Sequence, residues 1–209
     1  MVTSTELRDL LVAERVMPIV RSASRAHAVA IGRTLIEAGF RALEVSLTTP
    51  GALDAISTLA ADPRAEIGAG TVLTAADVAA ATAAGATFMV TPAVTASIEA
   101  SVDAGVPVLA GALTPTEILE ALERGASAVK LFPAEFGGPA YLSALRAPFP
   151  GVSLIPVGGV DLATGREYLR RGALALGVGS PLTGKATDPL DLASLAVRAA
   201  EFRALSAAE

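Results

Sequence analysis

The sequence predicts an α/β fold, a (β/α)8 TIM barrel preceded by an N-terminal helix. Short runs rich in Val, Ile and Leu alternate with longer, Ala-rich amphipathic runs along the chain. Eight such pairs follow one another at intervals of about 20–26 residues, the spacing of a small barrel. A glycine that ends one run and leads into an apolar strand also recurs in five segments: AGFRALEV, AGATFMV, AGVPVLA, RGASAVKLF and RGALALGV.

The eight predicted strands are short apolar runs, as expected for parallel strands that are buried on both faces. In chain order they are VMPIV (16–20), ALEVSL (42–47), AEIGAG (65–70), TFMVTP (87–92), VPVLAG (106–111), SAVKLF (127–132), VSLIPV (152–157) and ALALGVG (173–179).

The intervening segments predict helices. The expected ranges are 3–14 before the first strand, then 24–38, 51–61, 74–84, 95–104, 114–124, 138–146, 161–171 and 189–205. Residues that cap helix N-termini open several of them: Ser24, Thr74, Thr95, Thr114 and Asp161. A doubly wound open sheet is the alternative fold, but it usually has fewer units, and no G-x-G-x-x-G follows the first strand.

Composition limits the classes of function. The chain of 209 residues shows no change in composition that would mark a linker, so residues 1–209 are expected to form one domain. The net charge of -5 gives no basic surface for a nucleic-acid partner. With no cysteine and only one histidine, His27, the chain offers no thiolate nucleophile and no His/Cys metal cluster, so no metal site is expected.

The chain also lacks the features of a membrane or secreted protein. No uncharged apolar run of about 18 residues is present, so no membrane contact is expected. The N-terminus has acids at Glu6, Asp9 and Glu14 and no long apolar core, unlike a secretory signal. The predicted location is the cytoplasm.

The chemistry of the site is indicated by a lysine in an apolar strand. The chain has fourteen arginines and only two lysines, Lys130 and Lys185, and Lys130 lies within AVKLFP. A buried ammonium is costly, but lysine, unlike arginine, can lose its proton and attack a carbonyl. Because side chains alternate along a strand, Lys130 and Glu44 of ALEVSL are both expected to point into the barrel.

This pair predicts a catalytic amine with a neighbouring carboxylate. Burial lowers the pKa of a lysine from about 10.4 towards about 7–8, where the neutral amine can react. A Schiff base then withdraws electrons from an adjacent carbon–carbon bond while the carboxylate moves protons. The expected chemistry is carbon–carbon cleavage or formation next to a carbonyl. The alternative is a buried ion pair that only holds the barrel together.

Two glycine-rich loops predict an anion site. The loops after the seventh and eighth strands, VGGVD (157–161) and GVGSPLTG (177–184), occupy the usual position of the barrel phosphate site. The alternative is that these glycines only form turns. The candidate ligands are Gly158, Gly159, Gly179 and Ser180.

Other strand ends supply further candidates. Arg21 ends the first strand and is either a clamp on a substrate carboxylate or phosphate or a solvated cation. Thr71 follows the third strand, where it can bind a carboxylate, and Thr91 and Pro92 follow the fourth. His27 falls on the first helix after strand one and is expected at the surface rather than in catalysis.

Six of these segments occur in the order of a known family. EVSLTTPGAL, IGAGTVL, FMVTPA, LAGALTPTE, VKLFPAE and IPVGGVD together resemble the 2-keto-3-deoxy-6-phosphogluconate (KDPG) and 4-hydroxy-2-oxoglutarate (KHG) aldolases. The resemblance covers roughly residues 15–184 and implies a class I aldolase that works through a lysine imine, without metal or bound cofactor, commonly as a homotrimer. It implies reversible cleavage of a 2-keto-3-deoxy-6-phospho sugar acid, or of KHG, to pyruvate and an aldehyde such as glyceraldehyde 3-phosphate or glyoxylate.

The resemblance also assigns roles by motif. Lys130 corresponds to the Schiff-base lysine and Glu44 to the general acid and base. The remaining matches are Thr71 for the pyruvate carboxylate, Pro92 and Phe132 for the pocket wall, and Gly158, Gly159 and Ser180 for the distal phosphate.

Two positions depart from the pattern of gluconate-type members. Thr48 stands where those members often have arginine, and Arg21 is the hypothesised substitute. Val157 stands where they tend to have threonine and resembles the 6-phosphogalactonate branch, so relaxed or galactonate-type selectivity is possible.

Other functions remain open at this point. A phosphate-binding barrel isomerase or synthase would use Glu44 as a base without an imine, but would not explain lysine at position 130. A metal-assisted aldolase lacks a convincing ligand set. A sugar-phosphate-binding protein without catalysis would not explain why Glu44 and Lys130 occur together.

Overall fold

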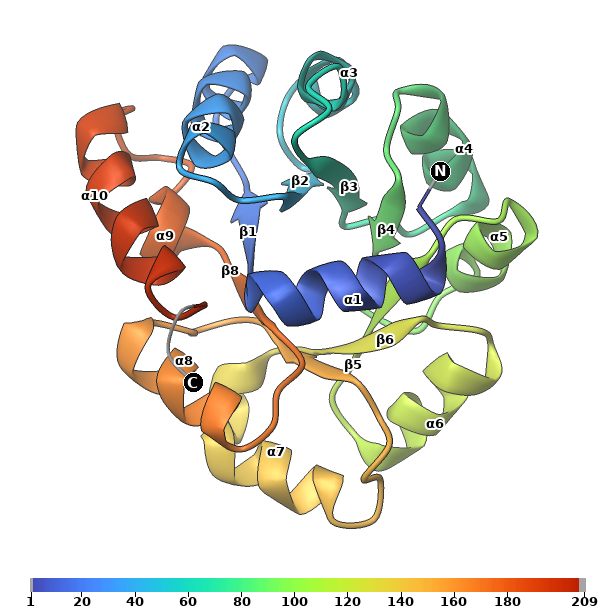
Figure 1. Ribbon diagram of the computed structural model, residues 1–209. Coiled ribbons are helices and arrows are strands. Elements are labelled where there is room, and N and C mark those ends of the chain that lie inside the picture. Colours follow the sequence, from blue (N-terminus) through green and yellow to red (C-terminus); the bar gives the residue numbers. More distant parts are fainter. Residues whose placement is uncertain (1, 207–209) are drawn as a thin grey trace.

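Residues 2–206 are described by the structure, a computed structural model. Its eight strands are parallel, as strands joined by helical crossovers must be. Their order is β7-β6-β5-β4-β3-β2-β1-β8, and a bridge between Val157 and Gly177 joins the two outer strands. The predicted barrel is therefore confirmed, and Figure 1 shows it from the end that helix α1 crosses.

All eight predicted strands are present, and most are shorter than the apolar runs that predicted them. The strands are β1 (Val16–Val20), β2 (Ala42–Ser46), β3 (Glu66–Gly70), β4 (Phe88–Val90), β5 (Val108–Ala112), β6 (Ala128–Leu131), β7 (Leu154–Pro156) and β8 (Leu176–Val178). Ala173 and Ala175 are buried but lie outside β8. An apolar run thus marks burial and extends beyond the paired residues.

The nine predicted helices are present, together with two short ones that the sequence did not predict. The helices are α1 (Ser4–Glu14), α2 (Arg25–Glu37), α3 (Ala52–Ala60), α4 (Ala75–Ala83), α5 (Ser97–Asp103), α6 (Pro115–Glu123), η1 (Ala134–Phe136), α7 (Gly138–Arg146), α8 (Leu162–Arg170), α9 (Ser180–Thr183) and α10 (Leu192–Arg203). The short helices η1 and α9 have too few residues to show a periodicity. Helix α10 starts later than predicted, because Asp191 caps it.

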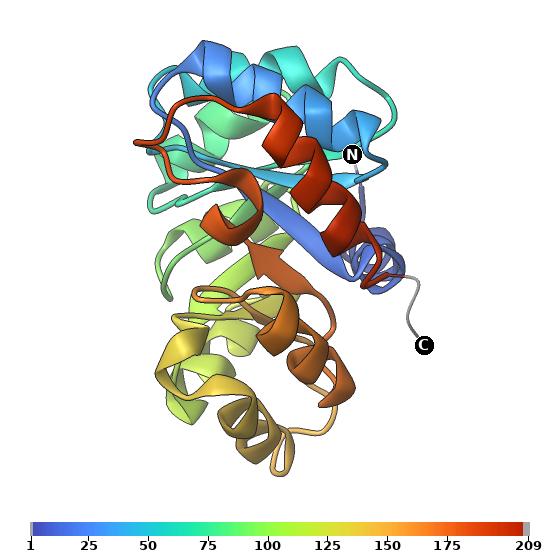
Figure 2. The same ribbon diagram turned by 90° about the vertical axis from the view of Figure 1, so that its left-hand side faces the viewer.

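The apolar core has two layers. The outer layer lies between the strands and the surrounding helices, and it contains Val45 and Val129. The inner layer fills the inside of the barrel near its N-terminal end with side chains such as Phe88 and Ile155, together with Leu11 of α1. Helix α1 thus closes the N-terminal end of the barrel. Figure 2 shows α1 at one end of the barrel, leaving the opposite end for a site.

A buried carboxylate ties the first and last helices to the barrel. Glu14 is only 2% exposed and ends α1. Its carboxylate accepts hydrogen bonds from the backbone N–H of Arg41 at 3.1 Å, from Nε of Arg41 at 3.0 Å and from Nη1 of Arg203 at 2.7 Å. Because the group is buried, losing its charge leaves several donors without a partner.

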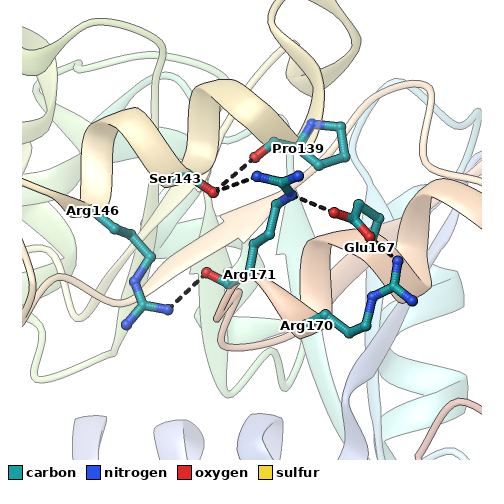
Figure 3. A network of polar contacts seen from close by, with 6 residues as sticks. All are labelled: Pro139, Ser143, Arg146, Glu167, Arg170 and Arg171. Carbon is teal, nitrogen blue, oxygen red and sulfur yellow. Dashed lines mark hydrogen bonds and ion pairs between the residues drawn. The ribbon is translucent and has the colours of Figure 1, made fainter.

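A more exposed network joins α7 and α8 on the outside of the barrel (Figure 3). Arg171 donates to Oγ of Ser143 at 3.0 Å, and Arg146 donates to the carbonyl of Arg171, also at 3.0 Å. Glu167 forms ion pairs with Arg170 and Arg171. Exposed pairs of this kind contribute little to stability, and the network packs two neighbouring helices together.

Candidate active site

A cavity of about 400 Å³ opens at the C-terminal ends of the strands, the end at which barrel enzymes bind their substrates. The candidate Thr91 does not line it, because Thr91 is buried and its Oγ1 donates to the carbonyl of Ala93 at 2.6 Å. Ten other candidates do line it. They are Arg21, Glu44, Thr71, Pro92, Lys130, Phe132, Gly158, Gly159, Gly179 and Ser180.

Lys130 and Glu44 face each other across the floor of the cavity. They come from β6 and β2, and the distance from Nζ of Lys130 to Oε1 of Glu44 is 3.9 Å. Lys130 is 6% exposed and Glu44 1%. The predicted alternation is confirmed, because Val129 packs in the outer layer and Ala128 in the inner one. The separation is longer than a hydrogen bond, so the amine and the carboxylate are not hydrogen-bonded directly to each other.

Glu44 has the environment of a proton carrier. Burial raises the pKa of its carboxyl, and the positive charges of Lys130 and Arg21 oppose that shift. Its buried Oε2 has no hydrogen-bond partner among residues 2–206. A buried polar atom without a partner is costly and is often found at functional sites. This oxygen is therefore available to a substrate hydroxyl or a water molecule.

Gly70 allows Glu44 to take this position. A Cβ atom at Gly70 would lie 1.9 Å from Oε1 of Glu44, so the carboxylate occupies the space that a side chain would need. The sequence analysis did not assign a role to Gly70. The signal that could have identified it is a glycine inside a strand, which often marks close approach of another group.

Lys130 lies beside an aromatic ring at the mouth of the cavity. The ring centroid of Phe132 is 5.3 Å from Nζ of Lys130, within the range of a cation–π contact. On the other side, Gly111 of β5 pairs with Lys130. A Cβ atom at Gly111 would lie 2.2 Å from the backbone carbon of Pro92, so glycine lets the loop after β4 approach β5 closely.

Three hydroxyl groups form a chain beside Glu44. Oγ of Ser46 lies 2.8 Å from Oγ1 of Thr48 and 3.0 Å from Oγ1 of Thr71. Thr71 has a φ of 61°, which is rare for a β-branched residue. Such strain is found where the surrounding structure holds a residue in place for function. Because side chains alternate along β2, Ser46 shares the inward face of the strand with Glu44.

The two predicted anion loops lie on one side of the cavity. Gly158 and Gly159 have φ values of 98° and 69°, which other residues rarely adopt. A Cβ atom at Gly159 would also lie 2.6 Å from Cβ of Glu135. At Gly179 a Cβ atom would meet nothing within 4 Å, which leaves open space beside the adjoining Ser180.

Arg21 and His27 occupy different places. Arg21 is exposed at the end of β1 and lines the main cavity. His27 is half-buried on α2 and lines a neighbouring cavity of about 200 Å³, to which Arg21 also contributes. His27 therefore lies outside the main cavity, in agreement with its predicted non-catalytic place.

The sequence analysis missed one charged lining residue. Lys185 follows α9 and borders both cavities. Two features of the sequence could have identified Lys185. It is the only lysine besides Lys130, and it directly follows the second predicted anion loop.

Residues 2–206 contain no cluster of three or more His, Cys, Asp or Glu side chains placed to hold a metal ion. Within the same part of the chain, no helix has the length and apolar character needed to cross a membrane.

Comparisons with known proteins agree with this geometry. A model of the family described as KDPG and KHG aldolase matches residues 7–195. The 2-dehydro-3-deoxy-phosphogluconate aldolase of Treponema pallidum is 41% identical over 158 residues, 74% of this chain and 75% of that protein. The probable 2-dehydro-3-deoxy-6-phosphogalactonate aldolase of Rhizobium meliloti is 37% identical over 168 residues, 78% and 79% of the two chains.

One similar solved structure holds a covalent intermediate. It is the KDPG aldolase of Legionella pneumophila with pyruvate captured as a covalent carbinolamine intermediate. It is 28% identical to this chain, with a TM-score of 0.81, and the match covers 95% of each chain. From the barrel, the cavity and these matches, it follows that the chain belongs to the KDPG and KHG aldolase family.

Proposed function

We propose that the protein is a class I aldolase that reversibly cleaves a 2-keto-3-deoxy-6-phospho sugar acid to pyruvate and an aldehyde, with KHG as a further substrate. The observation that carries the proposal is the buried amine of Lys130, 3.9 Å from the carboxylate of Glu44 on the floor of an open cavity. Members of the family need no metal, and the residues around Lys130 provide the groups that imine chemistry requires.

The first half of the reaction forms the imine. The neutral amine of Lys130 attacks the C2 carbonyl carbon of the keto acid and gives a carbinolamine. Loss of water, with a proton supplied by the Glu44 carboxyl, gives the imine. The carbinolamine of the Legionella pneumophila relative supports this step.

The second half breaks the carbon–carbon bond. The Glu44 carboxylate accepts the proton of the C4 hydroxyl, the C3–C4 electron pair moves into the imine, and the aldehyde leaves. The resulting enamine takes a proton at C3, and water then attacks C2 to release pyruvate and restore the amine. A carboxyl whose pKa is raised by burial suits both directions of proton transfer.

The remaining lining residues are proposed to hold the two ends of the substrate. The hydroxyl of Thr71, which lies 3.0 Å from Oγ of the buried Ser46, and the charge of Arg21 are assigned to the pyruvate carboxylate. The proposed wall and phosphate groups keep their assignments from the sequence: Pro92, Phe132, Gly158, Gly159, Gly179 and Ser180.

Relaxed selectivity is proposed, with KDPG as the substrate and its 6-phosphogalactonate epimer as a further substrate. Val157 is buried and lines the cavity, and it offers no hydroxyl to read the configuration of the sugar. The galactonate-type relative of Rhizobium meliloti supports this choice.

The test is pyruvate release, followed by its reduction to lactate, from the gluconate phosphate, the galactonate phosphate and KHG. The wild-type chain should release pyruvate from at least one of them without added metal. Lys130→Arg should abolish turnover, because a guanidinium cannot form an imine. Pyruvate release by that variant at the wild-type rate would mean that Lys130 is not the nucleophile.

Assembly as a homotrimer is also proposed. The family resemblance carries this proposal, and Phe136, which is 80% exposed beside the mouth of the barrel, is one side chain that a subunit contact could cover. Light scattering in solution will give the number of subunits. The single domain over 1–209 and the cytoplasmic location remain predictions.

A further inference from the structure

The two lysines of the chain border the same cavity. The sequence uses arginine fourteen times and lysine only at 130 and 185, yet both lysines line the main cavity. Lys130 has a proposed role in imine formation, whereas nothing in that mechanism uses Lys185.

The backbone around Lys185 is held against the barrel. The backbone N–H of Lys185 donates to Oδ2 of Asp188 at 2.9 Å, and the N–H of Asp188 donates back to the carbonyl of Lys185 at 3.0 Å. Two residues earlier, Oγ1 of Thr183 donates to the carbonyl of Ile19 in β1 at 3.1 Å. This closed turn places Lys185 beside the loop of Gly179 and Ser180, on the side of the cavity assigned to phosphate.

The charge of Lys185 has no carboxylate partner in the described part of the chain. Among residues 2–206, the ion pairs within 4.0 Å do not include Lys185. The nearby carboxylate of Asp188 already accepts the backbone N–H of the turn. An ammonium at a cavity wall without an anion is suited to bind an anionic ligand.

The other cations of the main cavity are Lys130 and Arg21, and Arg21, like Lys185, also borders the neighbouring cavity. Lys130 is within 3.9 Å of Glu44, and the charge of Arg21 also acts on Glu44. A substrate that has its keto group at Lys130 and its carboxylate near Arg21 extends its far end towards Ser180 and Lys185. The far end then lies beside the ammonium of Lys185.

We propose that Lys185 is a specificity-determining residue whose ammonium binds the terminal phosphate of the substrate, together with the glycine loops. This inference rests on the proposed function, because it assumes that the keto end reacts at Lys130. In this proposal, Lys185 makes the enzyme prefer phosphorylated keto acids over the same acids without the phosphate.

The test compares three variants on paired substrates. Lys185→Gln removes the charge, Lys185→Arg keeps it, and Arg166→Gln removes one positive charge from the exposed face of α8, outside the cavity. Each is assayed with the 2-keto-3-deoxy-6-phospho sugar acid and with the same acid lacking phosphate.

Lys185→Gln should lower kcat/KM for the phosphorylated substrate roughly 10- to 100-fold, mainly through KM, as expected for loss of one charged contact. The same variant should change kcat/KM for the unphosphorylated acid by less than about threefold. Lys185→Arg should retain most of the selectivity, and Arg166→Gln should leave both substrates unaffected. Equal losses on the two substrates, or no loss on either, would overturn the inference.

Binding of inorganic phosphate separates this inference from the proposed function. Calorimetric titration of the unreacted protein needs no turnover, and Lys185→Gln should weaken phosphate binding roughly tenfold or more while Arg166→Gln does not. If the wild type releases no pyruvate but binds phosphate through Lys185, the aldolase proposal fails and the binding role stands. If pyruvate is released and phosphate binding is unchanged in Lys185→Gln, the reverse holds.

Discussion

Replacing Gly70 with alanine tests whether Glu44, the proposed proton carrier, needs the space that the missing side chain of Gly70 leaves for its carboxylate. The added Cβ would lie 1.9 Å from Oε1 of Glu44, 2.5 Å from its Cδ and 2.6 Å from its Cγ. Contacts of a Cβ below 3.0 Å are essentially absent from proteins. Since three atoms of the side chain are affected, the whole carboxylate must move, and not only one oxygen.

The size of the effect follows from the distance. Moving Oε1 from 1.9 Å to an allowed contact displaces the carboxylate by about 1 Å, and a displacement of this size costs about 100-fold in rate. The proposed phosphate loops follow β7 and β8, whereas Gly70 lies in β3, so the loss should fall on kcat more than on KM. A carboxylate moved from its place would still leave Lys130 able to form an adduct.

The assay is steady-state pyruvate release, with circular dichroism and thermal unfolding to verify the fold. Gly151→Ala is the matched control, because a Cβ there would meet nothing within 4 Å, and it should retain wild-type activity. If Gly70→Ala folds normally and keeps the wild-type kcat, then Glu44 is either not held by this contact or does not carry the proton.

Three further predictions concern stability and selectivity. Glu14→Gln should lower the free energy of unfolding, measured by urea titration, by about 1–3 kcal/mol, because a buried carboxylate loses charged contacts to two arginines. As a control, Glu120→Gln removes a carboxylate from an exposed ion pair and should lower the free energy of unfolding by about 0.3–0.5 kcal/mol in the same titration. Burial raises the pKa of Glu44 above 4.5, so the folded protein binds that proton more tightly than the unfolded chain does. The free energy of unfolding should therefore fall as the pH rises from 4.5 through the folded-state pKa, and Glu44→Gln should remove this part of the fall; identical pH slopes would contradict it. Val157→Thr should raise cleavage of the gluconate epimer relative to the galactonate epimer roughly 3- to 10-fold, as one gained hydrogen bond allows, and an unchanged ratio would remove Val157 from the account of selectivity.

The barrel was predictable because its local signals agree with one another. Each strand is an apolar run, and capping residues such as Ser24, Thr74 and Asp161 open helices where expected. Strand ends were less predictable. Burial continues past the hydrogen-bonded residues, as at Ala173 and Ala175 beside β8, so hydrophobicity alone sets strand limits too wide.

The inward-facing pair was also predictable from the sequence. Side chains alternate strictly along each of the two strands, so Lys130 and Glu44 point into the barrel regardless of which strands pair with theirs. Because the strands are parallel, their C-terminal ends lie at the same mouth of the barrel. The same topology accounts for the arrival of Arg21, Thr71 and Ser180 at one cavity.

Other features of the site depend on three-dimensional packing. The need for glycine at position 70 comes from a side chain of a neighbouring strand, and the left-handed conformation of Thr71 has no signature in its residue type. The position of Lys185 at the cavity wall depends on the turn closed by Asp188 and on the four-residue helix α9 before it. Features of this kind become visible only when the elements are packed.

The central claim is that the amine of Lys130 forms an imine with pyruvate. Treatment of the protein with pyruvate and borohydride, followed by mass spectrometry of its peptides, tests it most directly. The account predicts one reduced pyruvyl group per chain, attached to Lys130, with Lys185 in the same sample unlabelled and Lys130→Arg giving no adduct. An unmodified chain, or an adduct on Lys185 in place of Lys130, would contradict it.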